Sequence, residues 1–264
     1  MTTKLLILGI VCGAVIAVLT RLVRALTPGG AVAAFFIIAG SLYFGGYACF
    51  AVLLFTFALV SVAGKIVGAR TAALTNGLHE KSGARDGVQV FANGFPALVT
   101  AVLCGITGNA AFAFAYTAAV AEALGDSLAS DIGVLSKKAP VDICTFRPAV
   151  RGLSGAVSLL GTLSAAVGIL LTAGFSMIFL RFSGRRFLLL CVLPFAGVLF
   201  DSVLGSRFQC RRQCTVCGKP TEKKVHCDHP TAVRGGIRFL NNDAVNLISN
   251  AVTAAVAAWL FCIL

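Results

Sequence analysis

Acidic residues follow an apolar run near the middle of the chain, where a hydrophobic helix would leave a membrane. The run covers residues 110–123, and the segment 125–133 after it holds Asp126, Ser130 and Asp131. An unpaired carboxylate buried at that depth would cost several kcal/mol. One interpretation is a helix end wetted by water. The alternative, favoured by matching residues elsewhere in the chain, is a site for a phosphate and a metal ion.

Polar residues recur at helical spacing at the ends of four apolar segments, so each set shares one helix face. Amides two turns inside an apolar helix need hydrogen-bond partners, which scattered helix caps would not provide. We therefore expect the four stripes to converge on one cytoplasm-facing cavity. The stripes are Arg85, Gln89 and Asn93; Glu122, Asp126 and Ser130; Asp201, Gly205 and Gln209; and Asn242, Asp243, Asn246 and Asn250.

The oxygen donors in these stripes suit Mg²⁺, which takes few protein ligands and completes its shell with water and substrate phosphate. The predicted magnesium ligands are Asp126, Asp201, Asn242, Asp243 and Asn246. Cations that could hold phosphates are Arg85, Lys137, Lys138 and Arg151. Ser154 lies in a Gly-Leu-Ser-Gly turn that would offer backbone N–H groups to an anion. The chain has no Walker-type phosphate loop, and its three histidines lie in predicted loops.

Composition places these residues in an integral, polytopic membrane protein. The chain has 264 residues, of which 58% are hydrophobic and 12% charged, and its apolar runs of about 20 residues match a bilayer core. We expect an all-α bundle of about eight spans forming a single transmembrane domain over residues 1–264. The first run resembles a signal peptide but lacks a cleavage site, so it is interpreted as a retained span. The predicted spans are 4–20, 30–44, 46–66, 88–104, 108–124, 153–179, 187–206 and 242–263.

The net charge of +12 lies almost entirely between the apolar runs. Such a charge first suggests nucleic acid, but basic loops kept in the cytoplasm explain it more simply, so no nucleic-acid partner is predicted. Four connections are basic and should share the cytoplasmic face of a cell membrane, namely 21–29, 64–87, 125–152 and 207–241. Arg181, Arg185 and Arg186 would then lie on the outer face. Either the span 153–179 is re-entrant or doubled, or the charge rule fails there.

Segments 85–94, 125–133, 200–205 and 242–246 together resemble, in the same order, the motifs of one membrane family. It is the family of plant phytyl-phosphate kinase and animal transmembrane protein 19, called domain of unknown function 92. The resemblance covers most of the chain. It implies as site residues Arg85, Gln89, Asn93, Asp126, Ser130, Asp131, Asp201, Asn242, Asp243 and Asn246. The chain departs from the family in having Asp131 for the usual glutamate and Leu153 for the usual threonine.

The resemblance implies an enzyme, a nucleotide-dependent kinase that converts an isoprenoid monophosphate to its diphosphate. A distant likeness to dolichol kinase and CDP-diacylglycerol synthase points to CTP as the nucleotide. Phosphate transfer of this kind would be carried by positioning and charge neutralisation. A cytidylyltransferase that makes a CDP-lipid is one alternative. A transporter is another, although transporters usually place polar residues at the midplane and show repeated halves.

The connection 207–241 is basic and also contains metal-ligand residues. Cys214 and Cys217 form a CxxC pair, and His226, Cys227 and His229 follow nine or more residues later. Cysteine and histidine at such spacing suit a tetrahedral structural Zn²⁺. Because His226 and Cys227 are adjacent, only one of them should ligate without strain, so the predicted ligands are Cys214, Cys217, Cys227 and either His229 or His226. The alternative is a reduced cytoplasmic loop without metal.

Overall fold

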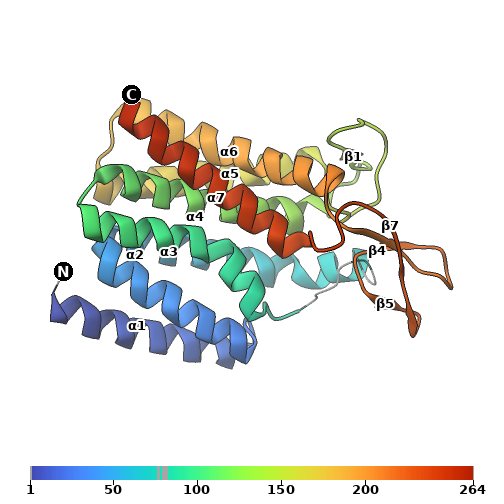
Figure 1. The fold of residues 1–264 in the computed structure, drawn as a ribbon, viewed down its shortest axis with the longest axis horizontal. Coiled ribbons are helices and arrows are strands. Elements are labelled where there is room, and N and C mark those ends of the chain that lie inside the picture. The colour runs from blue at the N-terminus through green and yellow to red at the C-terminus, as the bar shows by residue number, and fades with distance from the viewer. Residues whose placement is uncertain (1, 76–77, 79–82, 264) are drawn as a thin grey trace.

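The computed structural model describes residues 2–75, 78 and 83–263 and is an all-α helical bundle (Figure 1). Within these residues, six helices are long and apolar enough to cross a membrane. They are α1 (Thr3–Leu22), α2 (Pro28–Leu74), α3 (Gly87–Thr107), α5 (Leu159–Leu180), α6 (Gly184–Arg207) and α7 (Asn242–Ile263). Helix α4 (Ala110–Gly133) carries the acidic segment and lies among them. The polytopic α-helical fold predicted from the sequence is confirmed.

Helix α2 consists of two halves that meet at Gly46. The backbone there has φ 68° and ψ −169°, a conformation that only glycine adopts readily. The first half of α2 lies along α3. Its Gly29 lies beside Gly87 of α3 at one end, and its Phe44 lies beside Gly105 of α3 at the other. The second half ends where Thr71 donates a hydrogen bond to the Asp131 carbonyl on α4 at 2.7 Å. Because α3 and α4 run in opposite directions, the two halves of α2 do as well.

This reversal corresponds to the predicted boundary between spans 30–44 and 46–66. The second half, however, continues to Leu74, so the basic connection predicted from residue 64 begins later. The helix predicted from residue 153 also begins later, at Leu159. Gly152 and Gly155 have positive φ angles of 79° and 83°, which interrupt the chain before the Ser158 cap. The span is therefore neither doubled nor re-entrant, and the total of eight spans stays a prediction.

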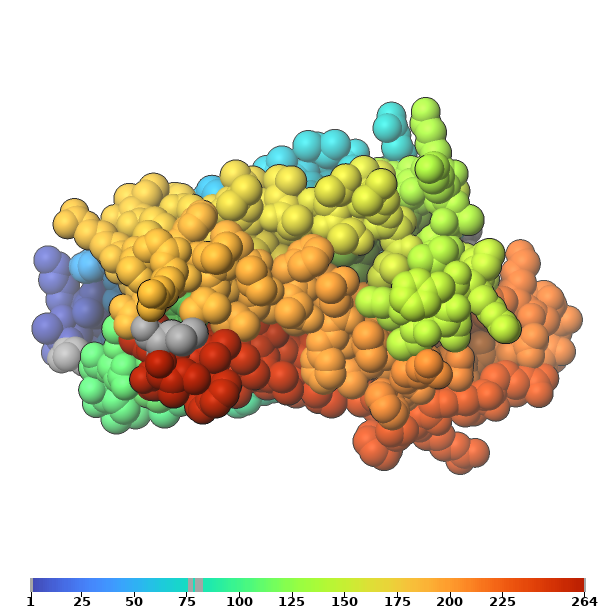
Figure 2. All heavy atoms as spheres, turned by 90° about the horizontal axis from the view of Figure 1, so that it is seen from above, coloured from blue at the N-terminus to red at the C-terminus, as the bar shows by residue number. Residues whose placement is uncertain are grey.

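Four connections gather at one end of the bundle, called here the cavity end (Figure 1). Connection 23–27 meets 75–86 through Thr27, whose N–H donates to the Arg85 carbonyl at 3.0 Å. Connection 208–241 meets 75–86 through the Glu222 N–H and the Leu78 carbonyl at 2.7 Å. Figure 2 shows connection 134–158 beside 208–241 at this end. The predicted clustering of the four basic connections on one side is thus confirmed.

Short strands occur only in two of these connections within the described residues. Strands β1 (Val141–Asp142) and β2 (Ala156–Val157) pair in connection 134–158. Connection 208–241 holds a three-stranded antiparallel sheet of order β4-β3-β7 and a separate β5–β6 hairpin. Their bounds are β3 (Arg211–Gln213), β4 (Pro220–Thr221), β5 (Val225–His226), β6 (His229–Pro230) and β7 (Ala232–Gly235).

Both chain termini and the α5–α6 turn lie at the opposite end, called the far end (Figure 1). Helix α5 ends at Leu180, and the residue that caps it, Arg181, adopts the left-handed conformation with φ 46°. The Arg186 guanidinium lies 3.8 Å from the centre of the Phe261 ring on α7. A cation over an aromatic face is stabilised by the ring quadrupole. This contact gives Arg186 a structural role at the end where a basic residue was unexpected.

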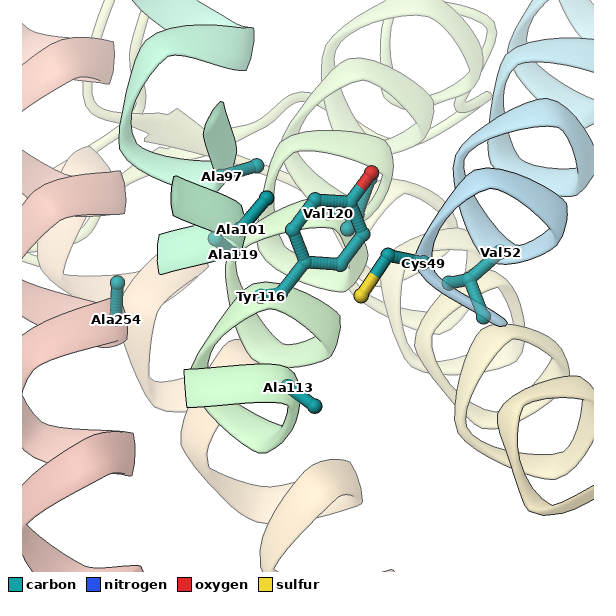
Figure 3. Packing of buried hydrophobic residues seen from close by; sticks show 9 residues of the cluster. All are labelled: Cys49, Val52, Ala97, Ala101, Ala113, Tyr116, Ala119, Val120 and Ala254. Atoms are coloured by element: carbon teal, nitrogen blue, oxygen red, sulfur yellow. The ribbon is translucent and has the colours of Figure 1, made fainter. Parts of the chain in front are cut away.

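Helix α4 is the centre of the bundle because small residues surround its few large ones. Tyr116 and Phe114 are fully buried, and most of their neighbours on the helix are alanines. Figure 3 shows the Tyr116 ring lying between Cys49 and Val52 of α2 on one side and Ala97 and Ala101 of α3 on the other. Small residues let membrane helices approach closely. Close packing on all sides fixes the depth and rotation of the acidic segment of α4.

Replacing Gly161 with alanine should destabilise the fold, because an added Cβ on α5 would meet the Ala129 carbonyl oxygen of α4 at 2.7 Å. Overpacking of this kind costs about 1–3 kcal/mol, or roughly 2–4 °C of melting temperature per kcal/mol. Thermal unfolding in detergent measures the change. Gly174→Ala is the matched control on the same helix, since no atom lies within 4 Å of its added Cβ. Equal melting temperatures for both variants would contradict the close crossing.

Candidate functional site

A buried polar network joins α4, α6 and α7 near the cavity end. The Ser249 hydroxyl lies 2.9 Å from both Glu122 Oε1 and Asp201 Oδ2, within hydrogen-bond distance of two carboxylates. Asn250 Nδ2 donates to Glu122 Oε2 at 2.7 Å and to the Ala119 carbonyl at 2.8 Å. Glu122 is 2% exposed and Asp201 is 8% exposed. The polar stripes of three helices therefore meet inside the bundle, as their spacing predicted.

A cavity of about 110 Å³ adjoins this network between α4, α5, α6 and the start of α7. Asp126 and Asp201 form its acidic wall, and the turn from Arg151 to Ser158 also lines it. Ala165 of α5 and Val198 of α6 line its apolar side. Of the predicted site residues, those that line the cavity are Asp126, Ser130, Arg151, Ser154, Asp201 and Asn242. The cavity thus combines negative, positive and apolar walls.

The acidic wall concentrates negative charge. Asp201 lies close enough to Asp126 and Glu122 for mutual electrostatic repulsion. Arg85 attracts Asp126 and forms an ion pair with Asp131, with Nη2 to Oδ2 at 3.9 Å. Among the described residues, no ion pair joins an arginine or lysine to Asp201. Buried carboxylates need a compensating charge, and a divalent cation with oxygen ligands supplies one. The donor set of Asp126, Asp201 and Asn242 therefore fits Mg²⁺.

Asn246 lies beside the cavity and orients Asp201. One end of its amide is 3.5 Å from Asn93 Oδ1 on α3. With its NH₂ group turned towards the neighbouring acceptors, that group donates to Asp201 Oδ2 at 3.3 Å and to the Asn242 carbonyl at 3.0 Å. Asn246 therefore donates a hydrogen bond to Asp201, a predicted metal ligand. The sequence had suggested that Asn246 would itself be a metal ligand. Asp243 is buried in the first turn of α7, outside the cavity lining given by the described residues.

Several predicted phosphate-binding residues have other positions. Lys137 and Lys138 are exposed on connection 134–158 and do not line the cavity among the described residues. Gln89 closes a capping box at the start of α3, where its Oε1 accepts the Asp86 N–H at 3.1 Å. Its side chain is therefore occupied by the helix end. Arg151, by contrast, lines the cavity, and its Nη2 also donates to the Lys137 carbonyl at 3.1 Å.

The turn before α5 differs from the open anion cradle that the sequence suggested. The Ser154 hydroxyl donates to Glu222 Oε1 at 2.6 Å. The Ala156 N–H donates to the Leu153 carbonyl at 2.9 Å, so that N–H is already used within the turn. At the helix start, the Ser158 side chain accepts the Gly161 N–H at 3.2 Å. The turn is thus a shaped cavity wall, fixed by its own hydrogen bonds and by Glu222.

Connection 134–158 is fastened to α6 by Asp142. Ser206 donates to Asp142 Oδ2 at 2.6 Å, and the Thr145 and Cys144 N–H groups donate to Oδ1 at 2.8 and 3.0 Å. Partial burial acts to raise the pKa of Asp142, but these hydrogen bonds outweigh it and lower the pKa below its ordinary value. The carboxylate therefore stays ionised at neutral pH and holds the turn that forms one cavity wall.

Glu122, Ser249 and Asp142 were not among the predicted site residues. Glu122 precedes Asp126 by one helical turn, so the spacing rule already placed it on the same face. Ser249 follows Asn246 by three residues and lies beside Asn250, in the same polar stripe of α7. A serine in an apolar helix is a weak signal because it can bond to its own backbone. Asp142 gave no periodic signal, because it lies in a connection without a regular repeat.

The cysteine-containing connection brings four potential metal ligands together. One donor atom from each of Cys214, Cys217, His226 and Cys227 lies within 4.8 Å of all the others. His229 is not in this group, and its Nδ1 faces the Cys227 carbonyl at 2.9 Å. Of the two histidines that the sequence left open, the structure thus brings His226 to the cysteines. The adjacent His226 and Cys227 point to the same place because Cys227 and Asp228 both have positive φ, 53° and 58°.

Comparison with known proteins identifies the family. The model of the family described as integral membrane protein DUF92 matches residues 11–254. The chain is 27% identical to Protein PGR of Arabidopsis thaliana over 281 aligned positions, covering 94% of this chain and 93% of the plant protein. It is 30% identical over 177 residues to the protein named uncharacterized membrane protein MJ0933 of Methanocaldococcus jannaschii. That match covers 66% of this chain and 62% of the archaeal protein.

No solved structure matches the chain. The family model spans both the acidic segment of α4 and the polar start of α7, which form the cavity described above. The resemblance carried by the four motifs and the family match therefore refer to the same residues. The chain is a member of the DUF92 family of integral membrane proteins.

Proposed function

We propose that this protein is a Mg²⁺-dependent kinase that transfers a phosphate from a nucleotide, CTP in the first instance, to an isoprenoid monophosphate. The observation that carries the proposal is one cavity lined by the acidic residues Asp126 and Asp201 together with the cation Arg151. Acidic residues that suit a metal and a cation that suits phosphate are the parts that phosphoryl transfer requires. The cavity end would face the cytoplasm, where the nucleotide is available, and basic connections support that orientation.

The cavity also suits a lipid substrate. Its apolar side is formed by Ala165 of α5 together with Phe195 and Val198 of α6, at membrane-spanning positions. A phosphate head group could occupy the polar walls while an isoprenoid chain contacts the apolar side. A soluble anion would gain nothing from that side. This pairing of polar and apolar walls favours a phosphorylated lipid over a soluble phosphate.

In the proposed reaction, an oxygen of the lipid monophosphate bonds to the γ-phosphorus of the nucleotide. The bond from that phosphorus to the β–γ bridging oxygen breaks, and a nucleoside diphosphate leaves. Mg²⁺ held by Asp126, Asp201 and Asn242 would neutralise phosphate charge. Arg151 would hold the phosphates, while Asn246 and Ser249 keep the Asp201 carboxylate oriented.

No strong general base is required for this reaction. The second ionisation of a phosphate monoester has a pKa of about 6, so the attacking oxygen is already anionic at neutral pH. This agrees with the position of His226 and His229, which lie in connection 208–241 and do not line the cavity. His79 lies outside the described residues. The work of the protein chain is then positioning and charge compensation.

The test uses the purified full chain in detergent with Mg²⁺, phytyl or geranylgeranyl monophosphate, and CTP, ATP, UTP or GTP in turn. We expect mass spectrometry to find the lipid diphosphate and a nucleoside diphosphate, and both to disappear when EDTA is added. A CDP-lipid with pyrophosphate would identify a cytidylyltransferase instead. If no pair gives a product and the protein carries isoprenoid phosphate across liposomes, the kinase proposal is wrong and a transporter is indicated.

A further inference from the structure

We propose that Cys214, Cys217, His226 and Cys227 bind one structural zinc ion that fastens connection 208–241 onto the cavity end of the bundle. The four residues are called here the cysteine knuckle. This inference does not rest on the proposed kinase reaction, because the knuckle is separate from the cavity lining in the described residues. It assigns three thiolates and one imidazole as ligands, and it chooses His226 over His229, which spacing had left open.

The donor atoms have the separations of a tetrahedral zinc site. His226 Nδ1 lies 3.2 Å from Cys227 Sγ and 3.6 Å from Cys217 Sγ. All four donor atoms lie within 4.8 Å of one another. Zinc–sulfur bonds of about 2.3 Å in a tetrahedron place two sulfurs roughly 3.8 Å apart. Three thiols and one imidazole gain little from lying this close together unless they share a metal ion, whose ligands must lie at these distances.

The local backbone is built to present these side chains. The Val216 and Cys217 N–H groups both point at Cys214 Sγ, each with N···S at 3.4 Å. Such donors stabilise a thiolate, which is the form that binds metal. On the opposite hairpin, His226 pairs with His229 across a two-residue turn formed by Cys227 and Asp228. Left-handed backbone at Cys227 is costly for a side-chain-bearing residue and needs a compensating interaction.

Within the described residues, the part of the connection around the knuckle has no hydrophobic core of its own. Its strands are two to four residues long. Val216 and Val225 are 59% and 57% exposed, so the knuckle region buries little apolar surface. Small units without a hydrophobic core are usually held by disulfides or metal ions. The cysteines of the knuckle are free thiols in this structure. A bound zinc ion would therefore supply the folding free energy that the sheet lacks.

The knuckle closes the β3–β4 hairpin, whose base touches the cavity wall. Thr221 at the end of β4 is 1% exposed and donates to the Leu78 carbonyl at 3.0 Å. The next residue, Glu222, accepts hydrogen bonds from Ser154 at 2.6 Å and from Gln209 Nε2 at 3.0 Å. Ser154 lines the cavity. Zinc in the knuckle would thus hold Glu222 in place, and Glu222 holds the turn before α5.

The test measures metal directly on the purified full chain in detergent. We expect inductively coupled plasma mass spectrometry to find about one zinc ion per chain, and X-ray absorption to show three sulfur ligands and one nitrogen ligand. His226→Ala and Cys227→Ser should lose the metal. Cys210→Ser is the matched thiol control in the same connection, and His229→Ala is the matched imidazole control. Both controls should retain zinc in full.

Two further measurements separate metal loss from misfolding. His226→Cys should keep zinc with four sulfur ligands, which X-ray absorption distinguishes from the parent site. Chelation of zinc from the parent protein should speed tryptic cleavage after Lys224, which is exposed in this connection, without changing the helical circular dichroism. Loss of zinc from His229→Ala with retention in His226→Ala would overturn the ligand assignment. A metal-free parent protein, an iron centre or a Cys214–Cys217 disulfide would overturn the zinc site itself.

Discussion

Asp126→Asn should reduce lipid diphosphate formation by at least about a hundredfold while leaving the fold intact. Asp126 lines the cavity and faces the repulsion of nearby carboxylates, with Arg85 as its attracting cation. The asparagine has nearly the same volume, so the substitution removes charge without opening a void. Loss of one anionic ligand should also raise the Mg²⁺ concentration needed for half-maximal turnover. Product formation at graded Mg²⁺, followed by mass spectrometry, measures both effects.

The control for this variant is Asp228→Asn, which removes the same charge from the exposed tip of the β5–β6 hairpin. Asparagine tolerates the left-handed backbone found at residue 228, where φ is 58°. We expect parent-like turnover from the control and a parent-like melting temperature from both variants. If Asp126→Asn keeps more than a tenth of the parent turnover, Asp126 does not belong to the reaction site.

Asn250→Leu should destabilise the bundle by about 1–3 kcal/mol. The Asn250 amide, which is fully buried, donates to Glu122 Oε2 and to the Ala119 carbonyl. Leucine would leave both acceptors without that donor in a site closed to water, and an unsatisfied buried carboxylate is expensive. Thermal and denaturant unfolding in detergent measure the loss.

A second substitution tests the physical reason for that loss. Glu122→Met removes the carboxylate, so the double variant Glu122→Met with Asn250→Leu should be more stable than Asn250→Leu alone. Replacing both partners of a buried polar pair with apolar groups is often nearly neutral. Ser249 keeps Asp201 as an acceptor in the double variant. Additive losses from the two substitutions would show that Glu122 and Asn250 are not coupled in the folded state.

The sequence predicted the convergence of polar stripes because the physics of a bilayer makes each buried polar residue informative. Charged and amide side chains inside apolar helices must face one another or a polar cavity. One cavity is accordingly lined by Asp126, Asp201 and Asn242. The same reasoning failed for Gln89, although the Asp86-x-x-Gln89 pattern is a readable capping box. Spacing alone does not separate a residue that faces a site from one that satisfies its own helix end.

Two other differences arose where local backbone geometry decides. Leu153, Ala156 and Val157 look like the start of a span, but positive φ angles at Gly152 and Gly155 delay the helix. A hydropathy pattern contains no information on backbone angles, so it could not show that the helix starts only at Leu159. His226 and Cys227 were expected to exclude each other as ligands because they are adjacent. The left-handed turn at Cys227 changes the direction of the chain between them, which a spacing rule for extended or helical segments does not anticipate.

The turns at the far end differ in charge, and therefore in the free energy needed to carry them across a membrane during insertion. If the cavity end faces the cytoplasm, as proposed, every far-end turn must be carried across the bilayer as the chain is made. The reversal at Gly46 lies between uncharged residues, so it crosses with little cost of dehydration. The α5–α6 turn must carry Arg181, Arg185 and Arg186, against the usual retention of cations. Biogenesis should therefore be slowest at the α5–α6 pair, and the contact of Arg186 with Phe261 forms only when the last helix arrives.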